Sequence, residues 1–428
     1  MNGMDRQLRD LLQTAAGEPP RQVTAAAVRR RVKRRRVTEG IAGIAVAAAV
    51  IAVVPVVTGA LGHASSPPET GIGAAGTPTV YIGDDREGGA VTPIRIATNT
   101  PGKPVRAGDP VIMASAPDGK ILYVVDSDST VLPIATATDT PGKPIRTGRL
   151  PAAIAVTPDG KTAYVVNSGA GTVTPIATAT NTPGKPIKVG VNPRLIAITP
   201  DGKTAYVVDQ SPGTPLVVNA KPSTVIPVST ATNTPAKPIK LPDHGSPFVI
   251  AVTPDGKTVY VATTVGAAST AEVVPITTAT NTSGKPIKAG RGASAMVISP
   301  DGKTVYLATD AGVVPITTAT NTAGKLIKVG ATTGLVITPD GKTVYACDPR
   351  AGRVTAITTA TDTAGKPIRI GATSLIGSSS TIAITPNGKT LYVIGRNSTT
   401  VTPITTATNT PGKPIRIGAT AEAIVITP

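Results

Sequence analysis

The side chains that most often carry catalysis are scarce in this chain of 428 residues. It has two histidines, His63 and His244, and one cysteine, Cys347, which lies in an apolar pattern typical of a buried strand. A metal centre needs several ligands close together, and a nucleophile needs a neighbouring base. Neither a phosphate-binding Gly-Lys-Ser/Thr loop nor a nucleophile elbow occurs in the sequence. We therefore expect no enzymatic activity, no metal, no cofactor and an unreactive thiol.

Three aspartates follow apolar stretches of the sequence: Asp126, Asp209 and Asp348. At the end of a strand, an aspartate carboxylate commonly accepts hydrogen bonds from the backbone of the next turn. We therefore assign these residues a structural role and no catalytic one.

Basic residues, by contrast, recur at regular intervals. The chain carries 42 Lys and Arg against 25 Asp and Glu, a formal charge of +17. One basic residue recurs at a fixed place near the end of each repeat: Arg106, Arg146, Lys188, Lys240, Lys288, Lys328, Arg369 and Arg416. Charged residues on an edge strand prevent sheets from joining edge to edge, and this is the favoured explanation. The alternative is a cationic rim that attracts an anionic cell-wall polymer.

These residues are positioned by a repeat that begins at residue 79, with periods of 39 to 54 residues. One motif, Pro-Asp/Asn-Gly-Lys, starts at 117, 158, 200, 254, 300, 339 and 386. A second, typified by Asn-Thr-Pro-Gly-Lys-Pro, starts at 99, 139, 181, 233, 281, 321, 362 and 409. Every tyrosine occupies the same place in its repeat: Tyr81, Tyr123, Tyr164, Tyr206, Tyr260, Tyr306, Tyr345 and Tyr392. We expect these side chains to pack in the core with a partner for each hydroxyl.

Each repeat predicts four antiparallel strands, which make one blade of a β-propeller. In the unit around Tyr164 the expected strands are 153–157, 162–167, 171–176 and 185–189. Pro158-Asp159-Gly160 suits the first turn, because Pro presets φ and Gly accepts a left-handed conformation. We expect Pro183-Gly184 to form the turn before the fourth strand.

One recurring feature has no explanation in this scheme. A proline lies inside the expected third strand at Pro93, Pro133, Pro175, Pro227, Pro275, Pro315 and Pro403. An internal proline removes a ladder hydrogen bond, so a bulge or a late strand start would be needed to accommodate it.

The two ends of the repeat region complement each other. It begins with a second strand, Thr79–Gly83, and ends with a first strand, Ala423–Thr427. Joined, they make one composite blade, which closes the circle and removes open sheet edges. We therefore predict an all-β fold over residues 79–428, a propeller of eight four-stranded antiparallel blades. Seven blades with a spare strand is the alternative.

Part of this repeat resembles a known family. The run Thr157-Pro158-Asp159-Gly160-Lys161, followed by Tyr164-Val165-Val166-Asn167, is similar to the repeat of YVTN-type β-propellers. The resemblance covers residues 79–428 and implies an extracytoplasmic or surface-layer propeller. Because members of that family mostly lack a defined activity, it implies fold and location more than function.

Strand direction reverses at each turn, so the two repeated motifs are expected on one face, the turn face. The connections after the second and fourth strands are expected on the opposite, variable face. Insertions at 210–223, 265–271 and 372–380 belong to the variable face. A specific site must break the repeat symmetry, so we place any binding site on that face.

The sixth residue before each motif proline is expected at the mouth of the channel. Arg194, Phe248 and Glu422 are the outliers at this position, and His244 lies in an adjacent loop. We predict that these four residues bind a partner, either a protein or an anionic polymer. Surface variation without function is the alternative.

The chain also carries a membrane signal. Ile41 to Leu61 contains no charge, and a helix of this length spans about 31 Å, the thickness of a bilayer core. The basic run 29–36 precedes it, which predicts a cytoplasmic tail over residues 1–40 and a propeller outside the cytoplasm. Residues 62–78 suit a flexible linker. We predict a single-pass signal anchor in the cell membrane; secretion after cleavage near Ala64 is the alternative.

The sequence thus predicts a monomeric, non-enzymatic propeller that serves as a binding scaffold at the cell surface, with no nucleic-acid partner. The alternative is a propeller enzyme of the lactonase-like or quinoprotein-like type, with its site on the variable face of the channel.

Overall fold

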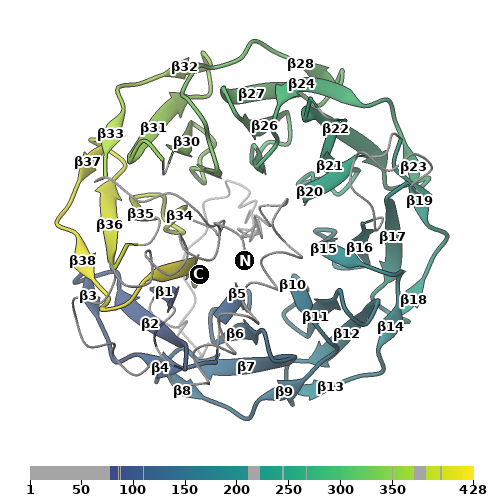
Figure 1. Cartoon of the computed structure of the whole chain (residues 1–428), viewed down its shortest axis with the longest axis horizontal. Helices are drawn as coiled ribbons and strands as arrows, with labels where there is room; N and C mark the ends of the chain where they lie inside the picture. Colours follow the sequence, from purple (N-terminus) through teal and green to yellow (C-terminus); the bar gives the residue numbers. More distant parts are fainter. Residues whose placement is uncertain are drawn as a thin grey trace, which may run out of the picture. The chain divides into compact units, whose positions relative to one another are not determined.

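The computed structural model describes residues 78–428, apart from positions 85, 87, 109, 211–221, 243–244, 267, 349, 371–381 and 396–397. Within these residues the strands form eight sheets, and all paired strands are antiparallel. The sheets are arranged as blades around a centre, with the first strand of each blade innermost (Figure 1). The predicted eight-bladed all-β propeller is therefore confirmed, and the seven-bladed alternative is wrong.

Each blade has three full strands and an outermost strand, which is split into two short pieces in seven of the eight sheets. The first strands are β5 (Pro110–Ser115), β10 (Pro151–Val156), β15 (Pro193–Ile198), β20 (Ser246–Val252), β25 (Ala295–Ile298), β29 (Gly334–Ile337), β34 (Ile382–Ile384) and β39 (Ala421–Ile426). The second strands are β6 (Ile121–Asp126), β11 (Thr162–Asn167), β16 (Thr204–Asp209), β21 (Thr258–Val265), β26 (Thr304–Thr309), β30 (Thr343–Asp348), β35 (Thr390–Ile394) and β1 (Thr79–Asp84). The third strands are β7 (Thr130–Ala135), β12 (Thr172–Ala177), β17 (Thr224–Ser229), β22 (Thr270–Thr277), β27 (Gly312–Thr317), β31 (Arg353–Thr358), β36 (Thr400–Thr405) and β2 (Ala90–Arg95).

The pieces of the outermost strands pair with the third strands. They are β3 (Thr100–Pro101) and β4 (Val105–Arg106), β8 (Thr140–Pro141) and β9 (Ile145–Arg146), β13 (Thr182–Pro183) and β14 (Ile187–Lys188), β18 (Thr234–Pro235) and β19 (Ile239–Lys240), β23 (Thr282–Ser283) and β24 (Ile287–Arg291), β28 (Thr322–Ala323), β32 (Thr363–Ala364) and β33 (Ile368–Arg369), and β37 (Thr410–Pro411) and β38 (Ile415–Arg416). We call β39 with β1–β4 blade 1, and number the others in chain order: β5–β9, β10–β14, β15–β19, β20–β24, β25–β28, β29–β33 and β34–β38.

The two ends of the described chain close the circle, as predicted. β1 pairs with β39 through Val80 opposite Ile426 and Ile82 opposite Ile424. Beyond the strand, the backbone N–H of Thr427 donates to the carbonyl of Thr79 at 3.0 Å. Blade 1 is therefore composite, and its inner strand comes from the far end of the sequence.

The core lies between the blades. Eight clusters of buried side chains each combine residues of two neighbouring blades, one cluster for every interface around the circle. Val, Ile, Leu and Ala fill them because the sequence has only one Phe and no Trp. Branched side chains suit strands that are covered on both faces.

The tyrosines link every blade to the next. All eight are at most 2% exposed, and each hydroxyl donates to an Asn or Asp side chain of the following blade at 2.6–3.2 Å. The acceptors, in the order of their tyrosines, are Asp139, Asn181, Asn233, Asn281, Asn321, Asp362, Asn409 and Asn99. Tyr392 of blade 8 donates to Asn99 of blade 1, so these bonds also close into a circle. The predicted core role of the tyrosines is confirmed.

The same acceptors correct one prediction about turns. The turn before the outermost strand of blade 3 is Thr178 to Asn181, and Pro183 already belongs to β13. Asn181 has a φ of 53°, a left-handed conformation that Asn tolerates better than most residues. Pro183-Gly184 is therefore not the turn, because Asn181 supplies the left-handed residue that the turn requires. The turn face consequently carries the Pro-Asp-Gly-Lys and Thr-Ala-Thr-Asn turns, and the Gly-Lys-Pro segment lies in the gap between the two pieces of the outermost strand.

The split of the outermost strand explains the internal prolines. Tyr164 lies opposite Pro175, and the register of β11 with β12 shows no shift, so the third strand contains no bulge. The carbonyl of Pro175 accepts the N–H of Gly184 at 2.7 Å, which shows that its backbone faces the outermost strand. That strand is interrupted there, between β13 and β14. The nitrogen of Pro175 therefore faces the gap, where no strand residue is placed to accept a ladder hydrogen bond. A proline at this position removes no hydrogen bond from the sheet.

The N-terminal predictions fall outside the described residues. These are the tail 1–40, the membrane span 41–61, the linker 62–78 up to residue 77, and the cleavage site near Ala64. Within residues 78–428, as far as they are described, no helix is long and apolar enough to cross a membrane.

Candidate functional site

The outermost strands carry the most regular chemistry on the molecule. Their sequence is Gly-Lys-Pro-Ile-Lys/Arg with few exceptions, among them Ala236 in place of Gly and Leu326 in place of Pro. Alternation along the strand buries the Ile and exposes the basic residue that follows it, as in β14, where Ile187 is buried and Lys188 exposed. The preceding Lys185 lies in the gap between β13 and β14 and is also exposed.

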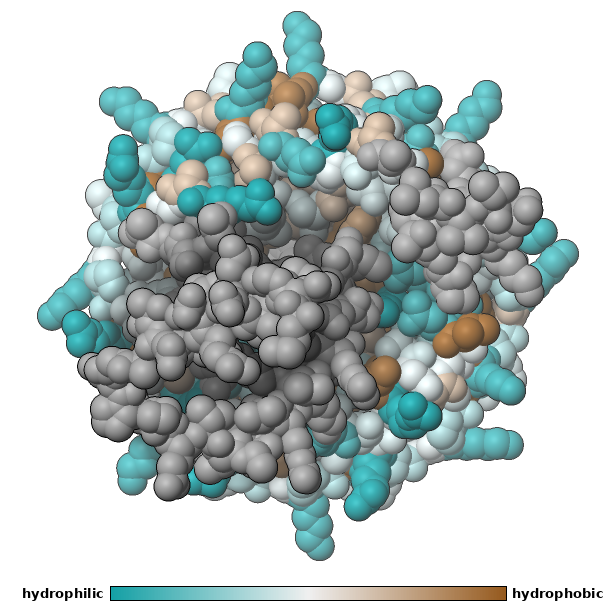
Figure 2. Space-filling view, viewed as in Figure 1, coloured by the Kyte–Doolittle hydropathy of each residue, from teal (hydrophilic) through white to brown (hydrophobic). Residues whose placement is uncertain are grey.

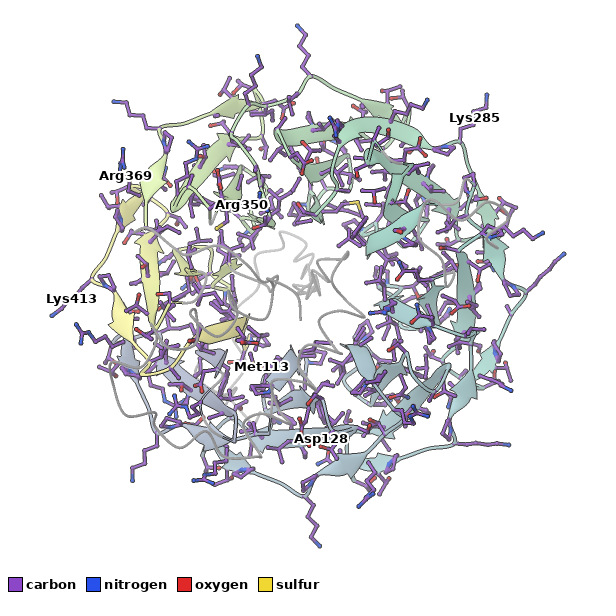
Figure 3. All side chains as sticks on the ribbon, in the orientation of Figure 1. Met113, Asp128, Lys285, Arg350, Arg369 and Lys413 are labelled. Atoms are coloured by element: carbon purple, nitrogen blue, oxygen red, sulfur yellow. The ribbon has the colours of Figure 1, made fainter. Side chains whose placement is uncertain are left out.

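Every blade therefore presents two basic side chains on its outer edge, and we call these sixteen residues the basic belt. The strand positions are Arg106, Arg146, Lys188, Lys240, Lys288, Arg369 and Arg416, and Lys328 is the equivalent position of blade 6, which is outside a strand. The gap positions are Lys103, Lys143, Lys185, Lys237, Lys285, Lys325, Lys366 and Lys413. All sixteen are exposed, and hydrophilic side chains project outward all round the edge (Figure 2). Figure 3 labels Lys285, Arg369 and Lys413 among them.

The belt carries charge without local compensation. Residues 78–428 contain 32 Lys and Arg and 20 Asp and Glu, a net charge of +12, and the belt accounts for half of the basic residues. Among the described residues, no ion pair involves a belt side chain. A continuous band of one sign around the circumference raises the local concentration of anions.

The turn face, by contrast, is locally neutralised. In blade 3, Asp159 lies 3.7 Å from the ammonium of Lys161 and accepts the Thr157 hydroxyl at 2.6 Å. The hydrogen bond from Thr157, followed by that from the Lys161 backbone, lowers the pKa of Asp159. The same arrangement recurs at Asp201 and Asp255. These turns are repeated structural units. Six of their seven lysines have an acidic neighbour, which the belt lysines lack, and Lys389 follows Asn387 instead.

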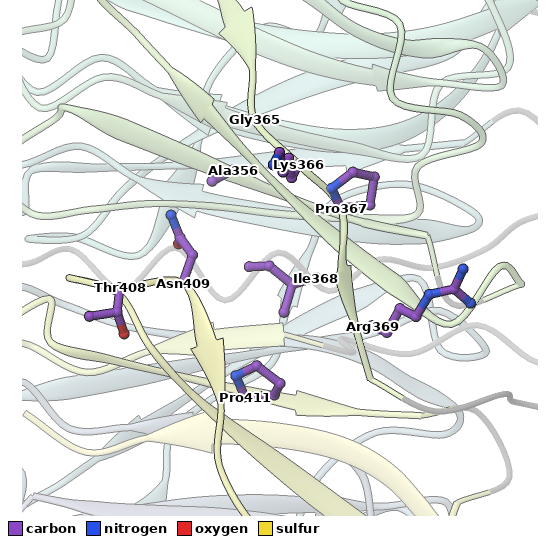
Figure 4. A pocket seen from close by; sticks show the side chains of 9 residues that line it. All are labelled: Ala356, Gly365, Lys366, Pro367, Ile368, Arg369, Thr408, Asn409 and Pro411. Carbon is purple, nitrogen blue, oxygen red and sulfur yellow. The ribbon is translucent and has the colours of Figure 1, made fainter.

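A pocket, which we call the blade 7 pocket, lies between blades 7 and 8 and is lined in part by belt residues. It has a volume of about 380 Å³. Its lining comes from the third and outermost strands of blade 7 and from the turn and outermost strand of blade 8: Ala356, Gly365, Lys366, Pro367, Ile368, Arg369, Thr408, Asn409 and Pro411. Figure 4 shows Ile368 extending toward Asn409, and Arg369 extending away from it.

Three of the four residues predicted to bind a partner, Arg194, Phe248 and Glu422, lie on first strands. Arg194, Phe248 and Glu422 each coincide with a register shift of the first strand, in β15, β20 and β39. β15 and β20 are neighbours, whereas β39 contacts β34 and β5, so the structure brings Arg194 and Phe248 to adjacent strands and leaves Glu422 elsewhere on the circle. His244 lies outside the described residues.

The environments of these side chains differ. Phe248 is 7% exposed, which makes it part of the interior. The Nε of Arg194 donates to Asn192 at 3.2 Å, and burial lowers the pKa of the guanidinium. Their shared role in a binding site stays a prediction.

The strand-end aspartates have structural partners. The carboxylate of Asp209 accepts the backbone N–H groups of Val191 and Asn192 at 3.1 and 2.7 Å, and so fixes the connection from blade 3. Burial raises the pKa of Asp209, because these two hydrogen bonds compensate only part of the lost hydration. Asp348 accepts the N–H of Ala351 at 3.1 Å. Cys347 is fully buried, as expected.

Sequence reasoning missed two exposed apolar side chains on the variable face. Leu150 is 48% exposed and Val191 is 71% exposed. Leu150 also has a φ of 50°, a left-handed conformation that is unfavourable for a leucine. Leu150 immediately precedes Pro151, and the equivalent residue of the next repeat is Asn192, which precedes Pro193. An apolar residue where the next repeat has a polar one was the signal available in the sequence.

No group of three or more His, Cys, Asp and Glu side chains is placed to hold a metal ion within the part of the chain that the structure describes. The belt and the blade 7 pocket both carry exposed basic side chains. Both favour anions.

Comparison with known proteins identifies the fold. No protein-family model matches the chain, and no curated protein matches its sequence. Among similar solved structures is the Kuenenia stuttgartiensis hydrazine synthase, at 24% identity and a TM-score of 0.55, aligned over 70% of this chain and 96% of that one. Another is the dihydro-heme d1 dehydrogenase NirN in complex with DHE, at 14% identity and a TM-score of 0.65, aligned over 84% and 77%. A third is apo AztD from Citrobacter koseri, at 13% identity and a TM-score of 0.58, aligned over 82% and 97%. At these identities the likeness shows the propeller fold alone, and the YVTN-type resemblance stays a prediction.

Proposed function

We propose that this protein is a non-enzymatic scaffold at the cell surface, which holds an anionic polymer against the basic belt of its propeller. The observation that supports this most is the repetition of two exposed, unneutralised basic side chains in every blade. A polymer can therefore engage the belt in any rotational register.

Protection of the sheet edge explains only part of the belt. A charged residue within an edge strand prevents edge-to-edge pairing, which accounts for the strand positions such as Lys188. Lys185 lies in the gap between β13 and β14, where the backbone is outside the ladder. Edge protection gives no role to a second cation at that place, whereas polyanion binding does.

The expected energetics suit a long ligand. A single exposed charge contact contributes about 0.2–1 kcal/mol, too little for measurable binding. A polymer that follows four blades meets eight such side chains, which gives about 2–8 kcal/mol before the cost of association. Because the contacts are linked, affinity should increase steeply with polymer length and fall with salt.

The membrane prediction decides which polyanion is meant. If residues 41–61 cross the membrane as expected, the propeller faces the outside, where cell-wall and surface polymers are the available polyanions. Nucleic acid is therefore not the expected partner. A surface location remains part of this proposal.

Two variants with equal charge test the belt. In the belt variant, Gln replaces seven gap lysines: Lys103, Lys143, Lys185, Lys237, Lys285, Lys325 and Lys413. In the matched control, Gln replaces the seven lysines of the Pro-Asp/Asn-Gly-Lys turns: Lys120, Lys161, Lys203, Lys257, Lys303, Lys342 and Lys389. We expect inorganic polyphosphate to bind the parent and the turn variant at about 50 mM salt, and to bind the belt variant much more weakly. Equal weakening in both variants would show that net charge, and not the belt, attracts the polymer.

A further inference from the structure

Blade 7 differs from the other seven blades at one position of its third strand. There the recurring proline is replaced by Ala356. In six blades the proline ring lies over the Gly of the outermost strand, so that a Cβ on that Gly would be 3.0–3.2 Å from the ring Cγ. At Gly365 the nearest atom to such a Cβ is the carbonyl oxygen of Ala356, at 3.4 Å. The space that a proline ring fills elsewhere is therefore open in blade 7.

The pocket of about 380 Å³ lies at this place. Ala356, Pro367, Ile368 and Pro411 give it apolar surface, so that hydrocarbon parts of a ligand can be buried there. The backbone of blade 7 has the same geometry here as that of the other blades, since the N–H of Gly365 donates to the carbonyl of Ala356 at 2.8 Å.

Polar groups at the pocket are arranged for hydroxyls and anions. The Oδ1 of Asn409 accepts the hydroxyl of Tyr345 at 2.8 Å, which holds the amide in place and leaves its NH₂ group to donate to a ligand. Thr408 contributes a hydroxyl. Lys366 and Arg369 both belong to the belt and to the pocket lining, and both are exposed.

We propose that this pocket binds the polyol segment between two consecutive phosphodiesters of an anionic polymer. The segment's carbon atoms contact the proline and alanine surface, and its hydroxyls bond to Asn409 and Thr408. Lys366 and Arg369 engage the flanking phosphates. The arrangement of two cations around a neutral, hydrogen-bonding and partly apolar pocket matches a chain in which charged and neutral groups alternate.

This inference deepens the proposed function and rests on it for the polymer as a whole. The belt would attract any polyanion, whereas the pocket would select one by its neutral unit. A proline-containing peptide is the other occupant that such a space could accept. It is disfavoured because an apolar ring would make no use of the exposed cations Lys366 and Arg369 or of the amide of Asn409.

One substitution closes the pocket, and another opens a copy of it. Ala356→Pro restores the residue that seven blades already accommodate, so the fold should be preserved. Pro403→Ala should open the equivalent pocket in blade 8. Its lining would have the same chemistry, from Lys413, Pro414, Ile415 and Arg416 with Thr98, Asn99 and Pro101 of blade 1.

Titration calorimetry of the full chain with a synthetic glycerol-phosphate trimer tests the proposal. We expect one site in the parent, about tenfold or weaker binding in Ala356→Pro, and two sites in Pro403→Ala. Inorganic phosphate, which lacks the polyol, should not distinguish the three proteins. Equal trimer binding by all three overturns the proposal, and so does a proline-rich peptide that binds the parent but not Ala356→Pro while the trimer binds neither.

The two proposals can fail separately. If the belt variant loses polyphosphate binding and Ala356→Pro does not affect trimer binding, the belt proposal stands and the pocket proposal is refuted. If the belt variant binds polyphosphate as the parent does and trimer binding depends on Ala356, the belt proposal is refuted and the polyol-phosphate site stands. The belt variant retains Lys366, so the pocket itself is intact in that experiment.

Discussion

The buried tyrosines should make this propeller unusually sensitive to alkali. Burial raises the pKa of Tyr123, Tyr260 and Tyr392 to about 12, and it raises the pKa of the other five as well. The ordinary tyrosine value is about 10. Loss of hydration is the largest cause in every case, since each phenol is enclosed between two blades.

The sign of the effect follows from which state releases protons first. Below pH 10 both the folded and the unfolded chain keep their tyrosines protonated, and the stabilisation is fully present. Between pH 10 and about 12 the unfolded chain loses protons that the folded chain retains, so the free energy of unfolding falls as pH increases. Each tyrosine contributes up to about 1.4 kcal/mol per pH unit, so the three whose pKa is about 12 together give up to about 4 kcal/mol per pH unit, to which the other five add.

A typical domain is stable by about 5–15 kcal/mol, so a loss that accumulates from pH 10 to about 12 should be large enough to unfold the propeller. Phenolate absorbance measures the titration directly, because the chain contains eight tyrosines and no tryptophan. We expect all eight to ionise in one steep step that coincides with the loss of the β-sheet circular dichroism signal. In Tyr123→Phe the slope should fall by one proton, and stability at neutral pH by about 1 kcal/mol, since the 3.0 Å bond to Asn181 is removed. Gradual ionisation around pH 10 in a protein that stays folded would refute the reasoning.

Two further predictions concern the closure of the circle and a strained loop. Removal of residues 421–428 takes away the inner strand of blade 1, where Ile424 and Val425 are each 3% exposed, and leaves β1 with an open edge. The loss of this buried surface should lower the free energy of unfolding by at least about 3 kcal/mol. Thermal unfolding should show a lower midpoint and light scattering larger species, and an unchanged monomer would contradict the closure. Leu150→Asn should raise the free energy of unfolding by about 1 kcal/mol, because Asn adopts a φ near 50° more readily than Leu and the lost side chain is half exposed. A lower stability in denaturant titrations would show that the contacts of Leu150 with its neighbours outweigh the backbone strain.

The sequence by itself determined the architecture of this protein. The repeat period, the Pro-Asp-Gly turns and one tyrosine per unit predicted the four-stranded blades, because these signals depend on local φ preferences and on alternating burial. The match between Thr79–Gly83 and Ala423–Thr427 predicted the closure and therefore the eight blades. The recurring basic residues were also visible, and the position of the lysines relative to the ladder supports the proposed polymer binding.

Tertiary structure decided what depends on contacts between strands and blades. Asn181 forms the turn that Pro183-Gly184 was expected to form, because its side chain is held by Tyr123 of the preceding blade. Pro175 is tolerated because the outermost strand is split opposite it, and Ala356 opens a pocket because a neighbouring Gly leaves the space uncovered. Pro175 and Gly184, like Ala356 and Gly365, are nine residues apart, and Tyr123 and Asn181 are 58 apart. The preference of each residue for a local conformation contains no information about these contacts.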